Sequence, residues 1–270
     1  MGYGDDLMAT GEVKELRAIY PEAKFVIGDG VKYYWSEIFE NNPYIIQGNN
    51  LKKHSDIKWV SNYLGNRPYR KYKTEQEKDR YVWNNAYSAK KGEIFFTEEE
   101  KEISTKIINE IKKKFKDKKI IYIEPNVKNK KGYKNRDWGF SKWQEVVSSL
   151  KLNYVFIQGT FGKQKKLQDV INVHGLNFRT ACSIIEKSDL FLGTEGGFHH
   201  AAAALNKKGV VIFGGFISPK ITGYDSHSNI YIDIKGSPCG SKNICNHCLE
   251  CMEKITPDII INHIDRNMRE

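Results

Sequence analysis

Residues 189–205 read DLFLGTEGGFHHAAAAL. The apolar run Leu190–Leu192 predicts a buried strand, and the alanine-rich run that starts at Gly197 predicts a helix. A strand that leads through glycines into such a helix is typical of an α/β sheet. The free N–H groups and the positive dipole end of the helix then favour an anion. We therefore interpret Gly193–Gly197 as a turn that binds a diphosphate. The alternative is an ordinary tight turn between strand and helix.

Other side chains near this turn suit an anionic ligand. Thr194 offers a hydroxyl group, and His200 offers a ring N–H. Gly214 ends the next predicted strand, at the edge where open α/β sheets bind ligands. Arg136 lies in a basic loop, Lys130–Trp138, and its guanidinium group can hold a phosphate through two hydrogen bonds. The other interpretation of this loop is a solvated surface segment.

Strands and helices alternate on both sides of the decisive stretch. After a helix that starts at a Thr97 cap and runs to Phe115, the pattern predicts strands at 119–124, 154–158, 190–192 and 209–213, and helices at 141–150, 163–170, 178–187 and 197–205. Towards the amino end it predicts a loop at 2–6, helices at 7–19 and 31–39, and strands at 23–27 and 44–46; a last helix is expected at 257–267. This alternation favours a parallel sheet with helices on both faces.

Composition and charge narrow the class of protein. The 270 residues are 40% hydrophobic, which is enough for a packed core, and no apolar run reaches the roughly 20 residues that span a bilayer. The start resembles no secretory signal, so we expect a cytoplasmic protein. The net charge of +10 favours polyanionic partners. However, the lysines are scattered, and the densest run, Lys112–Lys119, is typical of a solvated helix end. We therefore do not expect nucleic acid as a partner.

Four cysteines lie close together near the carboxyl end, at Cys239, Cys245, Cys248 and Cys251, with His247 among them. In a reducing compartment this spacing favours a metal over disulfides. It does not match the paired CxxC motifs of a zinc ribbon, so reduced, partly buried thiols remain the favoured interpretation and a metal site the open alternative. Cys182 is expected in the core.

A carboxylate near the amino end has two interpretations. Asp5 follows Gly4 just before the first predicted helix. It could act as a general base towards a substrate hydroxyl group, or it could simply cap the helix.

Together these motifs resemble glycosyltransferase family 9, the lipopolysaccharide heptosyltransferase family. The family pattern Asp-Thr-Gly-Pro-x-His-x-Ala-x-Ala is similar to Glu195–Ala204, and Lys-x-Trp-Pro-x-x-x-Trp is similar to Arg136–Trp143. Gly214–Pro219 and Ile255–Asp258 match further family segments. The resemblance covers about residues 120–265 well and residues 4–20 modestly.

The resemblance implies an α/β fold of the GT-B type, with two Rossmann-like domains that contain parallel sheets. We expect residues 1–115 to form the amino-terminal acceptor domain, 116–252 the nucleotide-sugar domain and 253–270 a carboxyl-terminal helix. Because Met1 directly precedes Gly2, the amino-terminal domain is expected to lack its first strand.

The resemblance also implies the chemistry: transfer of a sugar from a nucleotide-diphosphate donor, with inversion and without a metal or another cofactor. Asp5 is the implied base. The implied donor-binding residues are Arg136, Thr194, Glu195, Gly196, Gly197, Phe198, His200 and Gly214. The acceptor is expected to be a glycan or a lipid-linked glycan, reached by peripheral contact with the anionic inner face of the membrane. The alternative is a nucleotide-sugar-binding protein without turnover.

Departures from the family pattern leave the donor open. Glu195 stands where Asp is usual, Gly196 where Thr is usual, and Arg136 where Lys is usual. The turn after Gln158 has no acidic residue. ADP-heptose is therefore not assumed.

Overall fold

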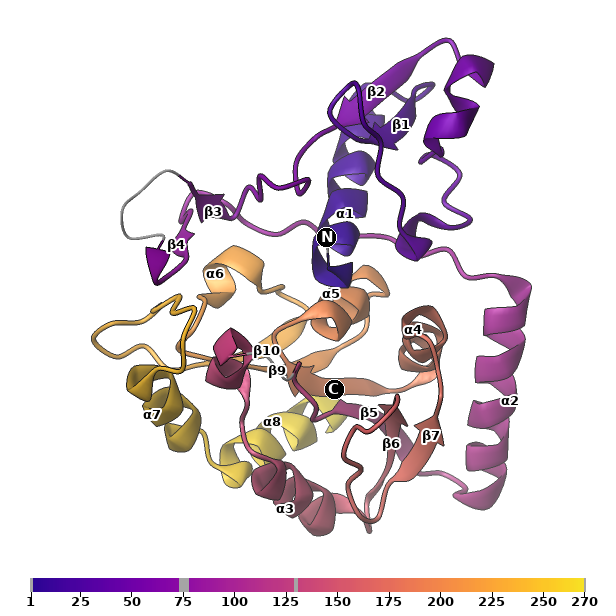
Figure 1. Cartoon of the computed structure of the whole chain (residues 1–270). Helices are drawn as coiled ribbons and strands as arrows, with labels where there is room; N and C mark the ends of the chain where they lie inside the picture. The colour runs from indigo at the N-terminus through magenta and orange to yellow at the C-terminus, as the bar shows by residue number, and fades with distance from the viewer. Residues whose placement is uncertain (1, 73–77, 129–130, 270) are drawn as a thin grey trace.

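A six-stranded parallel sheet dominates the computed structural model, which describes residues 2–72, 78–128 and 131–269 (Figure 1). Its strands are β5 (Lys119–Glu124), β6 (Tyr154–Thr160), β7 (Ile171–His174), β8 (Leu190–Thr194), β9 (Gly209–Gly214) and β10 (His227–Tyr231). They lie in the order β10-β9-β8-β5-β6-β7. This is the doubly wound strand order of dinucleotide-binding domains. The chain adds strands in one direction from β5 and in the opposite direction from β8, so the switch point lies between these two strands.

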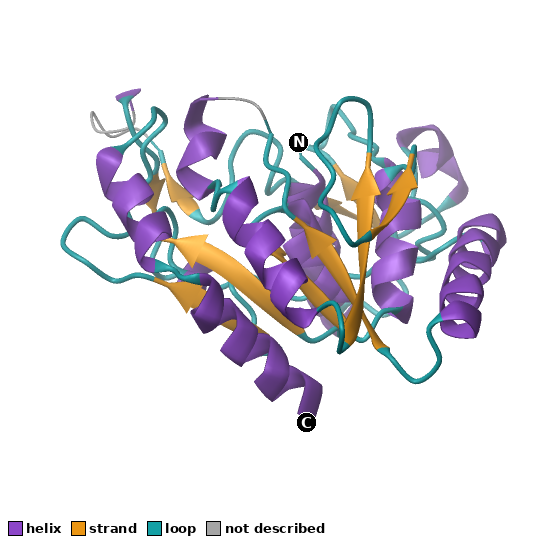
Figure 2. Cartoon of the chain, turned by 90° about the horizontal axis from the view of Figure 1, so that it is seen from below, coloured by secondary structure: helices purple, strands orange, loops and turns teal. Residues whose placement is uncertain are grey.

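Helices cover both faces of this sheet, as Figure 2 shows. They are α2 (Glu98–Lys114), α3 (Phe140–Leu150), α4 (Phe178–Lys187), α5 (Gly197–Ala204), α6 (Pro219–Thr222), α7 (Asn246–Lys254) and α8 (Pro257–Arg269). Successive strand residues point to opposite faces. Ile121 and Ile123 therefore pack with α3 and α8, whereas Ile120 and Tyr122 pack with α2, α4 and α5. The predicted α/β fold with a parallel sheet is confirmed.

The amino-terminal region forms a smaller layer above α5 (Figure 1). It contains α1 (Tyr3–Ile19) and a parallel pair, β1 (Lys24–Ile27) and β2 (Ile57–Val60), with a bridge from Phe25 to Ile45. The region also contains an antiparallel pair, β3 (Arg70–Lys71) with β4 (Val82–Trp83), and short 3-10 helices at Glu37–Phe39 and Gly48–Lys53. A further 3-10 helix, Lys131–Arg136, follows β5. Leu7, Met8 and Val13 of α1 share one apolar cluster with Ala201 and Ala203 of α5, so the two regions pack directly together.

Most of the predicted elements in the second half are confirmed. The bounds predicted for β5 and α4 match those of the structure, and Thr97 caps α2 through a reciprocal pair of hydrogen bonds with Glu100. Cys182 is fully buried, as expected. The lysine-rich run Lys112–Lys119 connects the end of α2 to the start of β5, as predicted. Trp138 and Trp143 pack edge to face in the core, and Trp138 donates to the carbonyl oxygen of Ile255 over 2.8 Å.

Two predictions at the amino end are wrong. Residues 2–6 do not form a loop, because α1 already begins at Tyr3 and its first turn contains Asp5 and Asp6. Carboxylates in a first turn are stabilised by the helix dipole. Residues 31–39 are not one helix either: the carboxylate of Asp29 accepts the N–H groups of Val31 and Lys32, and only the 3-10 turn at 37–39 remains.

The helix predicted at 163–170 is also absent from the structure. Glutamine side chains take over its backbone N–H groups: Gln158 accepts from Leu167 over 2.8 Å, and Gln144 accepts from Gln168 over 2.7 Å. Such side-chain bonds compete with helical ones. The sequence pattern also missed β7, β10 and α7. Within the described ranges, no helix combines the length and apolar character needed to cross a bilayer.

Candidate functional site

The glycine turn lies at the switch point of the sheet. Gly193 of β8 pairs with Glu124 at the end of β5, and Gly196 precedes the first turn of α5. Apart from its two chain neighbours, no atom of the described residues lies within 4 Å of a Cβ atom built on Gly196. Space is therefore open in front of the turn, beside the amino end of a helix. This is the geometry that favours bound phosphate.

Two of the predicted donor-binding residues form an ion pair. Arg136 donates to the Glu195 carboxylate over 2.5 Å, and the two side chains are 15% and 8% exposed. The guanidinium group also lies over the rings of Tyr133 and Phe216, at 4.5 Å and 5.2 Å from their centroids. Its Nε has no hydrogen-bond partner among the described residues. Glu195 therefore already balances the charge that was expected to hold the diphosphate. Lys130, in the same basic loop, lies outside the described residues.

His200 is buried next to this ion pair. Its Nδ1 is 2.8 Å from the hydroxyl oxygen of Tyr224, and its Nε2 is 3.8 Å from the Glu195 carboxylate. Burial lowers the pKa of His200, and it lowers the pKa of His199 strongly. Both imidazoles are therefore neutral at neutral pH. His199 packs among the rings of Tyr224 and His227.

The structure brings Asp5 to the same place. A Cβ atom built on Gly4 would lie 2.9 Å from His200, so the first turn of α1 contacts the start of α5. Asp5 is 8% exposed, and both of its oxygens are engaged. One accepts from the hydroxyl group of Tyr69 over 2.7 Å, and the other accepts from Nε of Arg67 over 2.8 Å.

The remaining predicted residues lie around the turn with different neighbours. Thr194 ends β8 and is half-buried. Phe198 stacks on Phe178, which in turn stacks on Tyr3. Gly214 adopts a φ of +62°, and a Cβ there would meet Met252. Phe198 and Gly214 therefore each have a packing contact next to the turn.

Two further carboxyl groups near the turn are not among the predicted site residues, although Asp6 lies in the same predicted carboxylate pair as Asp5. Burial raises the pKa of Asp6 from 3.8 to about 6; one oxygen accepts from the Ser36 hydroxyl group over 2.7 Å, and the other has no partner among the described residues. Burial also raises the pKa of Glu124 from 4.5 to about 8. The sequence could have indicated Glu124, because this residue ends the predicted strand 119–124, at the edge of the sheet where ligands bind. Nothing in the sequence distinguishes Asp6 from Asp5.

Two groups of side chains have the ligand types and spacing for a metal ion. One consists of Cys239, Cys245, His247 and Cys248, and the other of Glu195, His199 and His200. The second group lies against the guanidinium group of Arg136, which already neutralises Glu195 and would repel a cation. The first group consists of three thiols and an imidazole and contains no carboxylate that is already paired with a cation.

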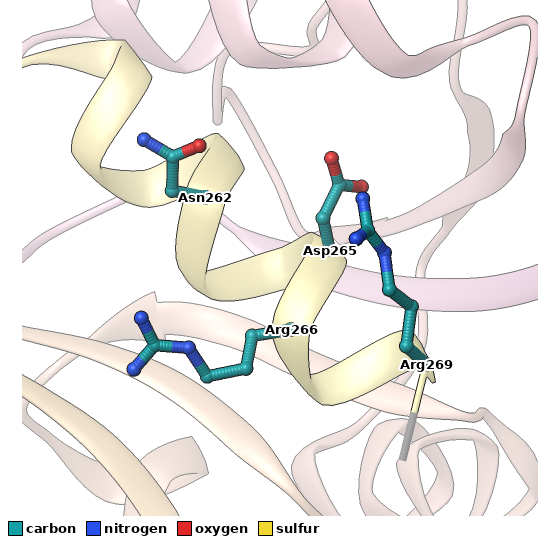
Figure 3. Close-up of a pocket in the computed structure, with 4 residues that line it drawn as sticks. All are labelled: Asn262, Asp265, Arg266 and Arg269. Carbon is teal, nitrogen blue, oxygen red and sulfur yellow. The ribbon is translucent and has the colours of Figure 1, made fainter.

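Two surface hollows lie away from the turn. One, of about 430 Å³, is lined by Asn262, Asp265, Arg266 and Arg269 of α8 (Figure 3). Asp265 accepts from Tyr154, the first residue of β6, so this hollow lies by the starts of the strands, opposite the glycine turn. The other hollow, of about 470 Å³, runs along α1 beyond Asp5 and is lined in part by Glu12, Tyr63 and Tyr87.

Comparisons with known proteins bear on the fold. No protein-family model and no curated protein sequence matches this chain. The glycosyl transferase family 9 structure from Veillonella parvula DSM 2008 is similar to it, with a TM-score of 0.68 and 13% identity over 99% of this chain and 94% of that one. The iron-containing dodecameric glycosyltransferase TibC from enterotoxigenic E. coli is similar with a TM-score of 0.63 and 13% identity, over 100% of this chain and 74% of that one.

A third structure matches over a shorter stretch. The ADP-heptose lps heptosyltransferase II of E. coli gives a TM-score of 0.46 and 18% identity over 65% of this chain, and the match spans only 53% of that protein. The two longer matches establish the fold. The GT-B-like fold that the family 9 resemblance implied is thus confirmed.

Proposed function

We propose that this protein is an inverting glycosyltransferase of the family 9 type, which moves a sugar from a nucleotide diphosphate to a hydroxyl group of a glycan. The main support is the open turn at Gly196, which lies at the switch point of the sheet and in contact with the helix turn that contains Asp5. An anion site beside a buried carboxylate is the pair of groups that this reaction requires.

In this proposal Asp5 takes the proton of the acceptor hydroxyl group. The freed oxygen attacks the anomeric carbon, and the bond between that carbon and the diphosphate oxygen breaks on the opposite side. The N–H groups at the start of α5 stabilise the negative charge of the leaving diphosphate, together with Arg136 once it turns from Glu195 to the phosphates. These groups supply the positive charge, so the proposed reaction assigns no metal ion to the turn.

The partners in this proposal are a nucleotide sugar and a glycan or lipid-linked glycan. The net charge of +10 would favour peripheral contact with an anionic membrane face on the cytoplasmic side. In this proposal the acceptor binds in the hollow along α1, whose lining mixes apolar side chains with the polar groups of Glu12, Asn62 and Ser88.

One observation favours a second candidate, a protein that binds nucleotide sugars without turnover. Arg67 and Tyr69 hold both oxygens of Asp5. Neither oxygen is then free to accept the proton of an acceptor hydroxyl group. Catalysis therefore requires that Tyr69 or Arg67 gives way to the acceptor hydroxyl group.

Isothermal titration with a panel of nucleotide diphosphates and their sugars, ADP-heptose included, tests the proposal. The matched variant is Gly196→Ala, whose new methyl group contacts none of the described residues beyond its chain neighbours but fills the space in front of the turn. We expect an unchanged melting temperature and loss of binding. If the folded wild-type protein binds no member of the panel, both candidates are excluded.

Asp5→Asn separates the two candidates. We expect it to bind the donor normally and to lower kcat by about 100-fold or more, the usual contribution of a general base. Asp56→Asn, an exposed carboxylate of the same region, is the control and should keep full activity. Donor binding with no turnover in the wild-type protein, against a broad set of acceptors, would favour the second candidate.

A further inference from the structure

The segment between β10 and α7 gathers three sulfur atoms and one imidazole. Sγ of Cys239 lies 2.9 Å from Sγ of Cys248 and 3.8 Å from Sγ of Cys245, and all three cysteines are free thiols. One ligand atom from each of these cysteines and one from His247 all lie within 4.8 Å of one another. Four ligand atoms at this spacing are close enough to contact one ion.

The spacing fits a tetrahedral ion. With metal–sulfur bonds of about 2.3 Å, two thiolates of a tetrahedral site lie about 3.8 Å apart. The Cys239–Cys245 distance already has this value, and the Cys239–Cys248 pair would widen towards it. Sulfur-rich tetrahedral sites select zinc or iron over magnesium and calcium.

His247 is prepared to act as the fourth ligand. Its Nε2 lies 3.2 Å from the hydroxyl oxygen of Ser237. Its Nδ1 is buried and has no hydrogen-bond partner among the described residues. A metal-bound imidazole usually has its other nitrogen fixed by such a neighbour. Ser237 therefore orients the ring so that Nδ1 is the free ligand atom.

The fourth late cysteine takes a different position. Sγ of Cys251 lies 3.9 Å from both Ser237 and Nε2 of His247, on the side of the ring away from Nδ1. It also packs against Gly215, where a Cβ atom would come within 2.4 Å of its sulfur. Cys251 is therefore a packing residue, although the sequence groups it with the other three.

We propose that Cys239, Cys245, Cys248 and Nδ1 of His247 bind one zinc or iron ion in a tetrahedral site. Two of these ligands, His247 and Cys248, lie in the first turn of α7 (Figure 1), where the helix dipole favours thiolate. The N–H group of Ser241 donates to Cys239 over 3.4 Å and supports the same charge.

The site holds the segment that ends in Arg136. Asn135 is fully buried; its Oδ1 accepts the N–H group of Cys245 over 3.0 Å, and its Nδ2 donates to the carbonyl oxygens of Ser241 and Asn243. On the other side, Cys239 donates its N–H group to the carbonyl oxygen of Gly215. The ion would thus brace the loop beside Arg136 and the turn after β9. This positioning role rests on the proposed function, whereas the metal site does not.

Elemental analysis of the full-length protein, purified under reducing conditions from medium with both metals, tests the site directly. We expect close to one zinc or iron ion per chain, and the analysis tells the two apart. Cys245→Ser and His247→Ala should lower the metal content severalfold or more. Cys251→Ser and Cys182→Ser are the matched controls and should keep it. Ser237→Ala should weaken metal affinity by about tenfold, as expected for a residue that only orients a ligand.

Cobalt(II) titration of chelator-treated wild-type protein provides a measurement that needs no variant. A tetrahedral thiolate site gives intense visible d–d bands and a thiolate-to-cobalt charge-transfer band. Absence of both metals and of these bands would overturn the proposal. So would a Cys239–Cys248 disulfide in the purified protein, or an equal loss of metal in Cys251→Ser and Cys245→Ser. None of these readouts depends on nucleotide-sugar binding, so the site can fail while the proposed function stands.

Discussion

Arg136 and Glu195, which are 59 residues apart in the chain, form an ion pair of 2.5 Å at the edge of the glycine turn. Both side chains are largely buried, so each ion depends on the other to offset its loss of hydration. The pair also sets the charge that a diphosphate would encounter. An anion that enters the turn must compete with Glu195 for the guanidinium group of Arg136.

The first prediction concerns this ion pair. Arg136→Met should lower the free energy of unfolding by about 3 kcal/mol, because Glu195 then remains buried without its partner. Glu195→Gln should lower the free energy of unfolding by less. The double variant should be more stable than Arg136→Met alone. Urea unfolding measures all three. Additive effects of the two single changes would show that the pair does not act as a unit.

The second prediction concerns Asp6. Its pKa in the folded protein is about 6, compared with 3.8 for an exposed carboxyl group. The folded protein therefore holds this proton more tightly than the unfolded chain does, so the contribution of Asp6 to stability falls as pH rises from about 4 to about 6. Asp6→Asn should then raise the free energy of unfolding at pH 7.5, by up to about 3 kcal/mol, and should have little effect at pH 4.

Denaturant unfolding at both pH values tests this, with Asp225→Asn as the exposed control. A stabilisation that is the same at pH 4 and pH 7.5 would contradict the raised pKa. So would an equal response of the control variant.

The third prediction concerns Glu124, whose pKa is raised to about 8 by burial. Below that pH the carboxyl group is neutral, and above it the group carries a negative charge beside the glycine turn. Binding of a nucleotide diphosphate should therefore weaken as pH rises through about 8. Titration calorimetry between pH 7 and pH 9 should show this for the wild type and not for Glu124→Gln. A pH profile that Glu124→Gln leaves unchanged would rule this group out, and Glu145→Gln, at an exposed position of α3, serves as the control.

The fourth prediction concerns Arg179 of α4, which is 1% exposed. It donates two hydrogen bonds to the carboxylate of Glu100, and further ones to the carbonyl oxygens of Glu37 and Phe95. It thereby joins the amino-terminal region to the large sheet domain. Arg179→Met should lower the free energy of unfolding by about 3–5 kcal/mol, because Glu100 then stays largely buried without its cation and the carbonyl oxygen of Phe95 loses its donor.

Glu186→Met, at an exposed position on the same helix, is the matched control and should change stability by less than about 0.5 kcal/mol. Comparable losses in the two variants would mean that the bonds of Arg179 add nothing specific. Thermal and urea unfolding give the same comparison by independent routes.

The sequence predicted well where the signal is local. The apolar runs of β5 and β8 and the Thr97 cap of α2 each specify their element through neighbours within a few residues. Prediction was wrong at 163–170, where glutamines from other segments take up the backbone N–H groups. Such competition is invisible to a periodic pattern.

By itself, then, the sequence determined the alternating α/β architecture, the glycine turn and its place at the end of a strand, because these follow from periodicity and from backbone freedom. Only the tertiary structure decided how the charges pair. Asp5 with Arg67, Arg136 with Glu195 and Arg179 with Glu100 join residues 62, 59 and 79 positions apart. It also separated Cys251 from the other three late cysteines. Electrostatic pairing depends on distances in space and on burial, and neither is set by residues that are adjacent in the chain.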